Sequence, residues 1–104
     1  HGAVAVSGER DLVTDGTLTV RSEGGSKLFT KITGAGCSLG GVTAVYLAET
    51  SPFIAALTAV QAYNLAGTRA AREAKGPGSF TAAFLDALYA ATPEEIAANP
   101  FVVL

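Results

Sequence analysis

The chain has 104 residues, of which 49% are hydrophobic and only 15% are charged. This length predicts one small domain, and the composition excludes an intrinsically disordered chain and a coiled coil. The net charge is −2 and no cluster of lysine or arginine occurs, which argues against a nucleic-acid-binding protein.

No segment has the character of a membrane span or a signal peptide. The longest charge-free stretch, residues 50–68, contains Pro52, Gln61, Asn64 and Gly67, too many polar or helix-breaking residues for a membrane helix. A single cysteine forms no internal disulfide, and one cysteine with one histidine builds no structural zinc site. We therefore expect a cytoplasmic protein without a membrane partner.

The first residue and the composition of the chain predict that it is part of a larger domain. The sequence begins at His1, contains no methionine and is rich in apolar residues for its size. We expect residues 1–104 to be a single segment of a larger domain.

The first third has the pattern of short strands. Residues 2–8 are small or β-branched and predict a buried strand. Residues 11–14 and 17–21 flank Asp15-Gly16, which favours a tight hairpin turn with positive φ at both central residues. After a turn at residues 23–26, residues 27–32 predict another strand.

From residue 36 onward the pattern is helical. Residues 37–48 are apolar nearly all round and predict a buried helix. Ser51 as N-cap and Pro52 at the first helical position predict a second helix, which runs to about Lys75.

Two further helices follow. Ser79 is placed to cap a third helix in which Phe80, Phe84, Leu88 and Leu85 share a face. The sequence from Thr92 to Glu95 has the pattern of a capping box. Strands in residues 2–32 and helices in residues 36–99 predict one edge of an α/β layered fold, with short strands and a hairpin followed by three to four helices.

The glycine-rich stretch Thr33, Gly34, Ala35 and Gly36 lies between a predicted strand and the predicted helix at Cys37. Glycines there let backbone N–H groups converge beside the helix N-terminus, which forms an anion site suited to phosphate. A tight strand-to-helix turn without a ligand explains the same spacing equally well. At Cys37 the helix dipole favours the thiolate, although a lone cysteine is more often a small buried apolar residue.

Three other positions have a functional and a plain reading. Ser7 closes a strand where α/β folds place ligands, or it caps a turn. The segment that begins at Gly76 exposes the N-terminus of a helix to a ligand, or it only caps that helix. Asn64 needs a hydrogen-bond partner if it is buried.

These motifs together resemble one family. The chain resembles the C-terminal part of hydroxyethylthiazole kinase. The resemblance depends on three segments: Ser7-Gly8-Glu9, the stretch Thr33–Cys37 (T-G-A-G-C) and the stretch from Gly76 to Phe80 (G-P-G-S-F). The match is colinear over essentially the whole chain. It implies a ribokinase-like α/β fold, phosphoryl transfer from ATP to the hydroxyethyl group of 4-methyl-5-(2-hydroxyethyl)thiazole, a need for Mg²⁺, and trimers with active sites at subunit boundaries.

The resemblance also implies roles for single residues. Gly34 is expected to contact substrate within an anion hole formed by Thr33, Gly34, Ala35 and Gly36, and Ser7 to contact the nucleotide. Cys37 stands where most of the superfamily has an aspartate that acts as base on the attacking hydroxyl. Because phosphoryl transfer relies chiefly on positioning and charge stabilisation, we expect Cys37 to assist near the hydroxyl rather than to form a covalent bond.

Family members are roughly twice as long as this chain or more. The N-terminal half is expected to supply the remaining thiazole and ATP contacts and the metal site. These 104 residues alone are therefore expected to be poorly soluble or to associate through an open sheet edge. The alternatives are another ribokinase-like kinase, acting on a pyrimidine or a sugar, or a non-catalytic interaction module. The cysteine at position 37 disfavours the former, and no recognition surface in the sequence supports the latter.

Overall fold

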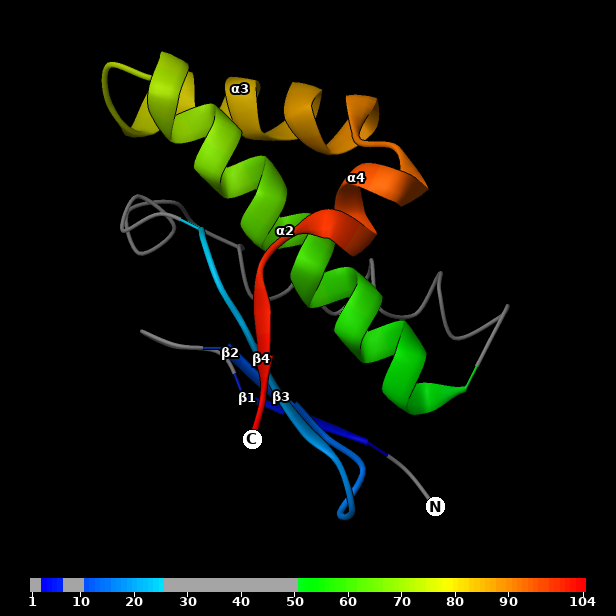
Figure 1. Cartoon of the computed structure of the whole chain (residues 1–104). Coiled ribbons are helices and arrows are strands. Elements are labelled where there is room, and N and C mark those ends of the chain that lie inside the picture. Colours follow the sequence, from blue (N-terminus) through cyan, green and yellow to red (C-terminus); the bar gives the residue numbers. More distant parts are fainter. Residues whose placement is uncertain (1–2, 7–10, 26–50) are drawn as a thin grey trace.

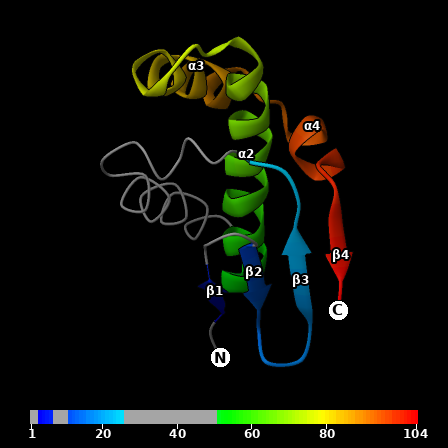
Figure 2. The same cartoon turned by 90° about the vertical axis from the view of Figure 1, so that its left-hand side faces the viewer.

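The computed structural model describes residues 3–6, 11–25 and 51–104, and the remaining residues are drawn as a grey trace in Figure 1. The described strands form one sheet in the order β1-β2-β3-β4, and each neighbouring pair is antiparallel. The strands are β1 (Val4–Val6), β2 (Asp11–Thr14), β3 (Thr19–Ser22) and β4 (Phe101–Val103). The described helices are α2 (Pro52–Glu73), α3 (Pro77–Ala90) and α4 (Pro93–Ala98). Figure 2 shows the sheet with its strands side by side and α2 running along it.

The predicted hairpin is confirmed, but its turn differs from the expectation. Thr14 pairs with Thr19, so residues 15–18 form the connection. Gly16 has a φ of +96°, whereas Asp15 does not take positive φ. Instead, the Asp15 carboxylate accepts hydrogen bonds from the backbone N–H groups of Leu18 (2.8 Å) and Thr17 (2.9 Å). These bonds lower the pKa of Asp15 and hold the turn without a left-handed aspartate.

Helix α2 begins as predicted and packs on the sheet. Ser51 is its N-cap and accepts a hydrogen bond from the Ile54 N–H (3.4 Å), with proline following in the first turn. Val13 of β2 packs against Ala56 and Val60 in a buried apolar cluster. The helix ends at Glu73, two residues before the predicted end, because Ala74 has an extended backbone.

Helix α3 packs across the C-terminal half of α2 (Figure 1). Phe80 and Phe84 are buried there as predicted, and the Phe84 ring meets the Tyr63 ring edge-on at a centroid distance of 4.9 Å. Leu85 was expected on the same face, but it is 56% exposed. One residue further along a helix lies about 100° round its axis, so the face that Phe84 buries leaves Leu85 outside.

The start of α3 also corrects an expectation. The helix begins at Pro77 with Gly76 as N-cap, three residues before the start that a capping Ser79 requires. The Ser79 hydroxyl instead accepts hydrogen bonds from the N–H groups of Lys75 (3.0 Å) and Gly76 (3.3 Å). Helix capping and the burial of Phe80 thus account for this motif in structural terms.

Helix α4 and strand β4 bring the chain back to the sheet. The capping box at Thr92 and Glu95 is confirmed: each side chain accepts a hydrogen bond from the backbone N–H of the other, at 3.2 and 2.9 Å. Strand β4, which the sequence pattern did not predict, pairs with β3, and the Leu104 N–H donates to the Thr19 carbonyl (2.9 Å).

The strand expected at residues 27–32 and the helix expected at residues 37–48 lie outside the described residues. Within residues 3–6, 11–25 and 51–104, no helix combines the length and the apolar character needed to cross a bilayer.

Candidate functional site

The residues predicted to carry the chemistry lie just beyond the described elements. Ser7 follows the last residue of β1, and Thr33, Gly34, Ala35, Gly36 and Cys37 fall within residues 26–50; all six lie outside the described residues. The structure does describe the two points where residues 26–50 join the rest of the chain. These are Gly25, after β3, and Ser51, the N-cap of α2.

The chain leaves β3 in close contact with α2. Gly24 and Gly25 have φ values of +95° and +91°. The Gly25 N–H donates to the Asn64 carbonyl (3.1 Å) and to the Thr68 hydroxyl oxygen (2.9 Å). A Cβ atom at Gly24 would lie 2.8 Å from that same Thr68 oxygen. Both the backbone conformation and the space therefore require glycine at position 24.

A buried polar network fixes this exit from the sheet. The Asn64 amide donates to the Ser22 hydroxyl (3.0 Å), and this hydroxyl donates to the Gln61 side-chain oxygen. The Gln61 amide donates to the Asn99 carbonyl (2.7 Å), and the Asn99 amide donates to the Glu23 carbonyl (2.9 Å). The network joins β3, α2 and the end of α4 without a buried charge.

The network resolves the question that Asn64 posed. Ser22, Gln61, Asn64 and Asn99 are all at most 5% exposed, and none of the described side chains has a buried polar atom without a partner. A fully satisfied buried network specifies one arrangement of the elements that it joins. The sequence analysis missed Gln61 and Thr68 as partners, although their spacing with Asn64 marks one polar stripe on an otherwise apolar helix.

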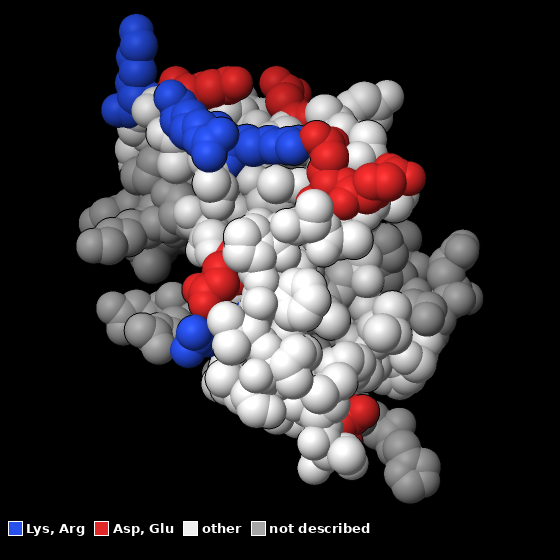
Figure 3. Space-filling model, viewed as in Figure 1, with Lys and Arg blue, Asp and Glu red and all other residues white. Residues whose placement is uncertain are grey.

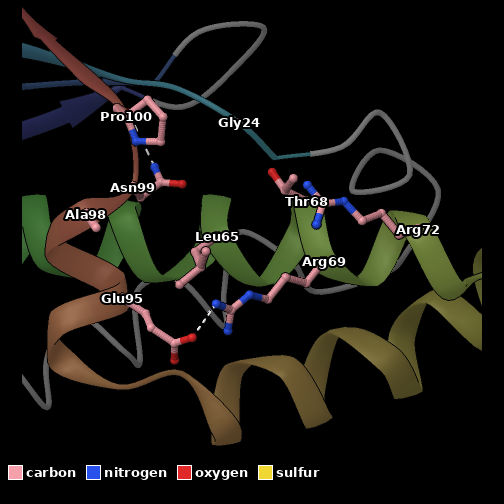
Figure 4. A pocket seen from close by; sticks show the side chains of 9 residues that line it. All are labelled: Gly24, Leu65, Thr68, Arg69, Arg72, Glu95, Ala98, Asn99 and Pro100. Carbon is pink, nitrogen blue, oxygen red and sulfur yellow. Dashed lines mark hydrogen bonds and ion pairs between the residues drawn. The ribbon is translucent and has the colours of Figure 1, made fainter.

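A cavity of about 420 Å³ opens beside this network. It lies between the C-terminal half of α2, helix α4 and the chain after β3 (Figure 4). Leu65, Ala98 and Pro100 give it an apolar part, while Thr68 and Asn99 contribute polar groups. Its charged lining residues are Arg69, Arg72 and Glu95.

Of the charged residues described in the cavity lining, Arg69 and Glu95 form an ion pair, whereas Arg72 does not. The Arg69 guanidinium contacts the Glu95 carboxylate at 2.5 Å, and both side chains are partly exposed. The hydrogen bond from Arg69, together with that from the Thr92 N–H, lowers the pKa of Glu95 to about 2. Within the described part of the chain, Arg72 has no ion pair or side-chain hydrogen bond.

The Glu95 carboxylate is expected to make the stability of the fold decrease at acid pH. Because its pKa falls from 4.5 to about 2 on folding, its contribution is complete above pH 4.5 and is lost as the pH falls toward 2. Glu95→Gln keeps a capping side chain but removes the charge. The melting temperature of wild type should exceed that of the variant at neutral pH, and the difference should vanish at low pH. A difference that stays constant across this range would contradict the assignment.

The described residues offer no metal centre. No group of three or more His, Cys, Asp or Glu side chains in residues 3–6, 11–25 and 51–104 is placed to hold a metal ion.

Comparisons with known proteins agree on one family. The family model "HK: Hydroxyethylthiazole kinase family" matches residues 1–94. The chain is 63% identical over 99 residues to a protein named hydroxyethylthiazole kinase from Bifidobacterium animalis subsp. lactis. It is 46% identical over 93 residues to one of the same name from Cereibacter sphaeroides.

A solved structure gives the same result. The structure of a hydroxyethylthiazole kinase protein from Pyrococcus horikoshii OT3 matches with a TM-score of 0.91 and 33% identity, over 98% of this chain and 41% of that one. The two aligned relatives are covered over 33% and 36% of their own length, against 95% and 89% of this chain. The chain thus spans about a third of the curated relatives, and it belongs to the hydroxyethylthiazole kinase family.

Proposed function

We propose that the protein carrying this chain transfers the γ-phosphoryl group of ATP to the hydroxyethyl group of 4-methyl-5-(2-hydroxyethyl)thiazole, in the cytoplasm, as a step of thiamine biosynthesis or salvage. The observation that carries the proposal is the family match over residues 1–94, with 63% identity to a protein of that name. The colinear motifs at residues 7–9, 33–37 and 76–80 support it.

In this proposal the glycine-rich stretch stabilises charge. The substrate hydroxyl oxygen attacks the γ-phosphorus, the bond from that phosphorus to the bridging oxygen breaks, and ADP leaves with the electron pair. The hydroxyl proton is released to solvent, with Cys37 proposed to assist near the hydroxyl. Backbone N–H groups of Thr33, Gly34, Ala35 and Gly36 form the anion hole for the charge on the transferring group. Gly34 contacts the substrate and Ser7 contacts the nucleotide.

The described residues on either side of residues 26–50 are both held by α2. Gly25 is bound to α2 through Asn64 and Thr68, and Ser51 caps the same helix. Both points where residues 26–50 join the described chain are therefore anchored on one rigid element. A catalytic group gains precision when its supporting elements are rigid.

The remaining requirements are assigned outside this chain. We infer that Mg²⁺ neutralises phosphate charge when bound, and that its ligands and the further ATP and thiazole contacts belong to the N-terminal part of the family's fold. The complete assembly is proposed to be a homotrimer. No step above depends on a metal ligand from the described residues.

The experiment is a phosphoryl-transfer assay with the protein at its natural length, ATP, Mg²⁺ and the thiazole alcohol. Formation of the thiazole phosphate together with ADP is the expected result. A hydroxymethylpyrimidine and ribose, offered as competing acceptors, test for a different kinase of the superfamily. Phosphorylation of either competitor in preference to the thiazole alcohol, or of no acceptor at all, would overturn the proposal.

Cys37 is proposed to assist the attacking hydroxyl. Cys37→Ser is expected to lower kcat by about tenfold with little change in KM, below the usual range of general-base effects because positioning dominates phosphoryl transfer. Cys37→Asp, which introduces the acid used by most of the superfamily, should restore turnover. Unchanged turnover in the serine variant would exclude the role.

A further inference from the structure

We propose that the cavity between α2 and α4 binds the phosphate group of a small phosphorylated molecule with an apolar body. The residues that carry this inference are Arg72, Arg69, Thr68 and the apolar group Leu65, Ala98 and Pro100. The phosphoryl transfer proposed above uses none of them, so the site is a second function of the same fold.

The charge of the cavity favours an anion. Three of the described residues that line it are charged; Arg69 and Glu95 form an ion pair, which leaves the Arg72 guanidinium as the excess charge among them. The pKa of Glu95, lowered to about 2, keeps that pair ionised at neutral pH. An anion entering the cavity therefore meets one guanidinium that has no counterion among the described residues.

The geometry favours phosphate over a simple halide. Arg69 and Arg72 are three residues apart on α2 and so share a face. Figure 4 shows both side chains extending along the helix toward α4, and Thr68 lines the same cavity. A planar guanidinium presents paired N–H donors that match two oxygens of one phosphate group.

The volume and the lining of the cavity narrow the class of ligand that it can bind. Figure 3 shows Lys and Arg side chains near the end of α2 with Asp and Glu side chains beside them, so the preference for an anion comes from the cavity lining and not from the wider surface. The cavity volume of about 420 Å³ falls in the range of small-molecule sites and exceeds what a bare phosphate fills. Leu65, Ala98 and Pro100 are available to contact the apolar part of the ligand.

The test uses the protein at its natural length without nucleotide, thiazole or magnesium. Binding of inorganic phosphate and of phenyl phosphate is measured by ligand-observed NMR. Wild type should bind both in the millimolar range, with phenyl phosphate the tighter because its ring contacts the apolar part of the cavity. Since no kinase substrate is present, failure of the proposed phosphoryl transfer leaves this result unaffected.

Three variants make the result specific to the cavity. Arg72→Gln should weaken phenyl phosphate binding by about tenfold or more, because it removes the charge and the paired N–H donors of the guanidinium. Lys75→Gln removes the same charge just beyond α2, outside the cavity lining, and should change binding less than about twofold. Arg72→Lys, which keeps the charge without the paired donors, should fall between them.

Each remaining outcome counts against the site. No binding by wild type at about 10 mM ligand would overturn it. Equal binding by wild type and a folded Arg72→Gln variant would place the anion elsewhere, for example in the glycine-rich stretch. Equal weakening by Arg72→Gln and Lys75→Gln would indicate only a diffuse electrostatic effect.

Discussion

Phe80→Ala is expected to lower the free energy of unfolding by about 3–5 kcal/mol, the range for removing a fully buried aromatic ring. The Phe80 side chain is 0% exposed and stacks on Phe84 at a centroid distance of 6.0 Å. The same cluster includes Tyr63, Ala66 and Ala70 of α2, so the ring joins α3 to α2. Small alanines across the interface cannot fill the space that the ring would leave.

Tyr89→Ala is the matched control for this prediction. Tyr89 is an aromatic residue of the same helix but is 94% exposed, and its truncation should change the free energy of unfolding by less than about 0.5 kcal/mol. Urea denaturation of the protein at its natural length measures both variants. Equal losses would mean that α3 is held through its outer face rather than through Phe80.

Gly24→Ala is expected to destabilise the protein by roughly 2–5 kcal/mol, because two effects add. A left-handed backbone conformation costs an alanine about 1–2 kcal/mol, and Gly24 has a φ of +95°. In addition, the new methyl group would lie 2.8 Å from the Thr68 hydroxyl oxygen. Forcing an extra group into packed space costs a further 1–3 kcal/mol or so.

Gly16→Ala separates the two effects. Gly16 has nearly the same φ, +96°, but a Cβ atom there would meet nothing within 4 Å. This variant should therefore lose only the backbone part, about 1–2 kcal/mol. The effect of alanine on the unfolded chain is common to both variants and cancels in the difference. If the two variants lose the same stability, the short distance between the added methyl group at position 24 and the Thr68 hydroxyl oxygen has no cost.

Local signals in the sequence predicted most of the described fold. The hairpin around Asp15-Gly16, the Ser51-Pro52 helix start and the capping box at Thr92 depend on neighbouring residues alone. The structure contains all three, although Asp15 lacks the positive φ that was expected of the turn. Strand β4 was missed because three residues are too few to show a two-residue period. Its position depends instead on pairing with β3, a contact that no local pattern encodes.

The candidate site was predictable to a different extent. Family resemblance assigned Ser7 and the stretch from residue 33 to Cys37, and these residues remain predictions because they lie outside the described residues. The cavity was not predicted at all. Its lining combines Gly24, Arg72 and Asn99, which are far apart in the sequence and meet only after α4 has turned back toward the sheet.

The pairing of Ser22 with Phe101 has a consequence for the order of folding. The β2–β3 hairpin closes over a few residues, whereas β4 joins β3 only after the chain between them, with α2, α3 and α4, has returned. Closing a long loop loses more entropy than closing a short one, so non-local strand pairing forms late. The hairpin is thus available as a template on which the last strand completes the sheet.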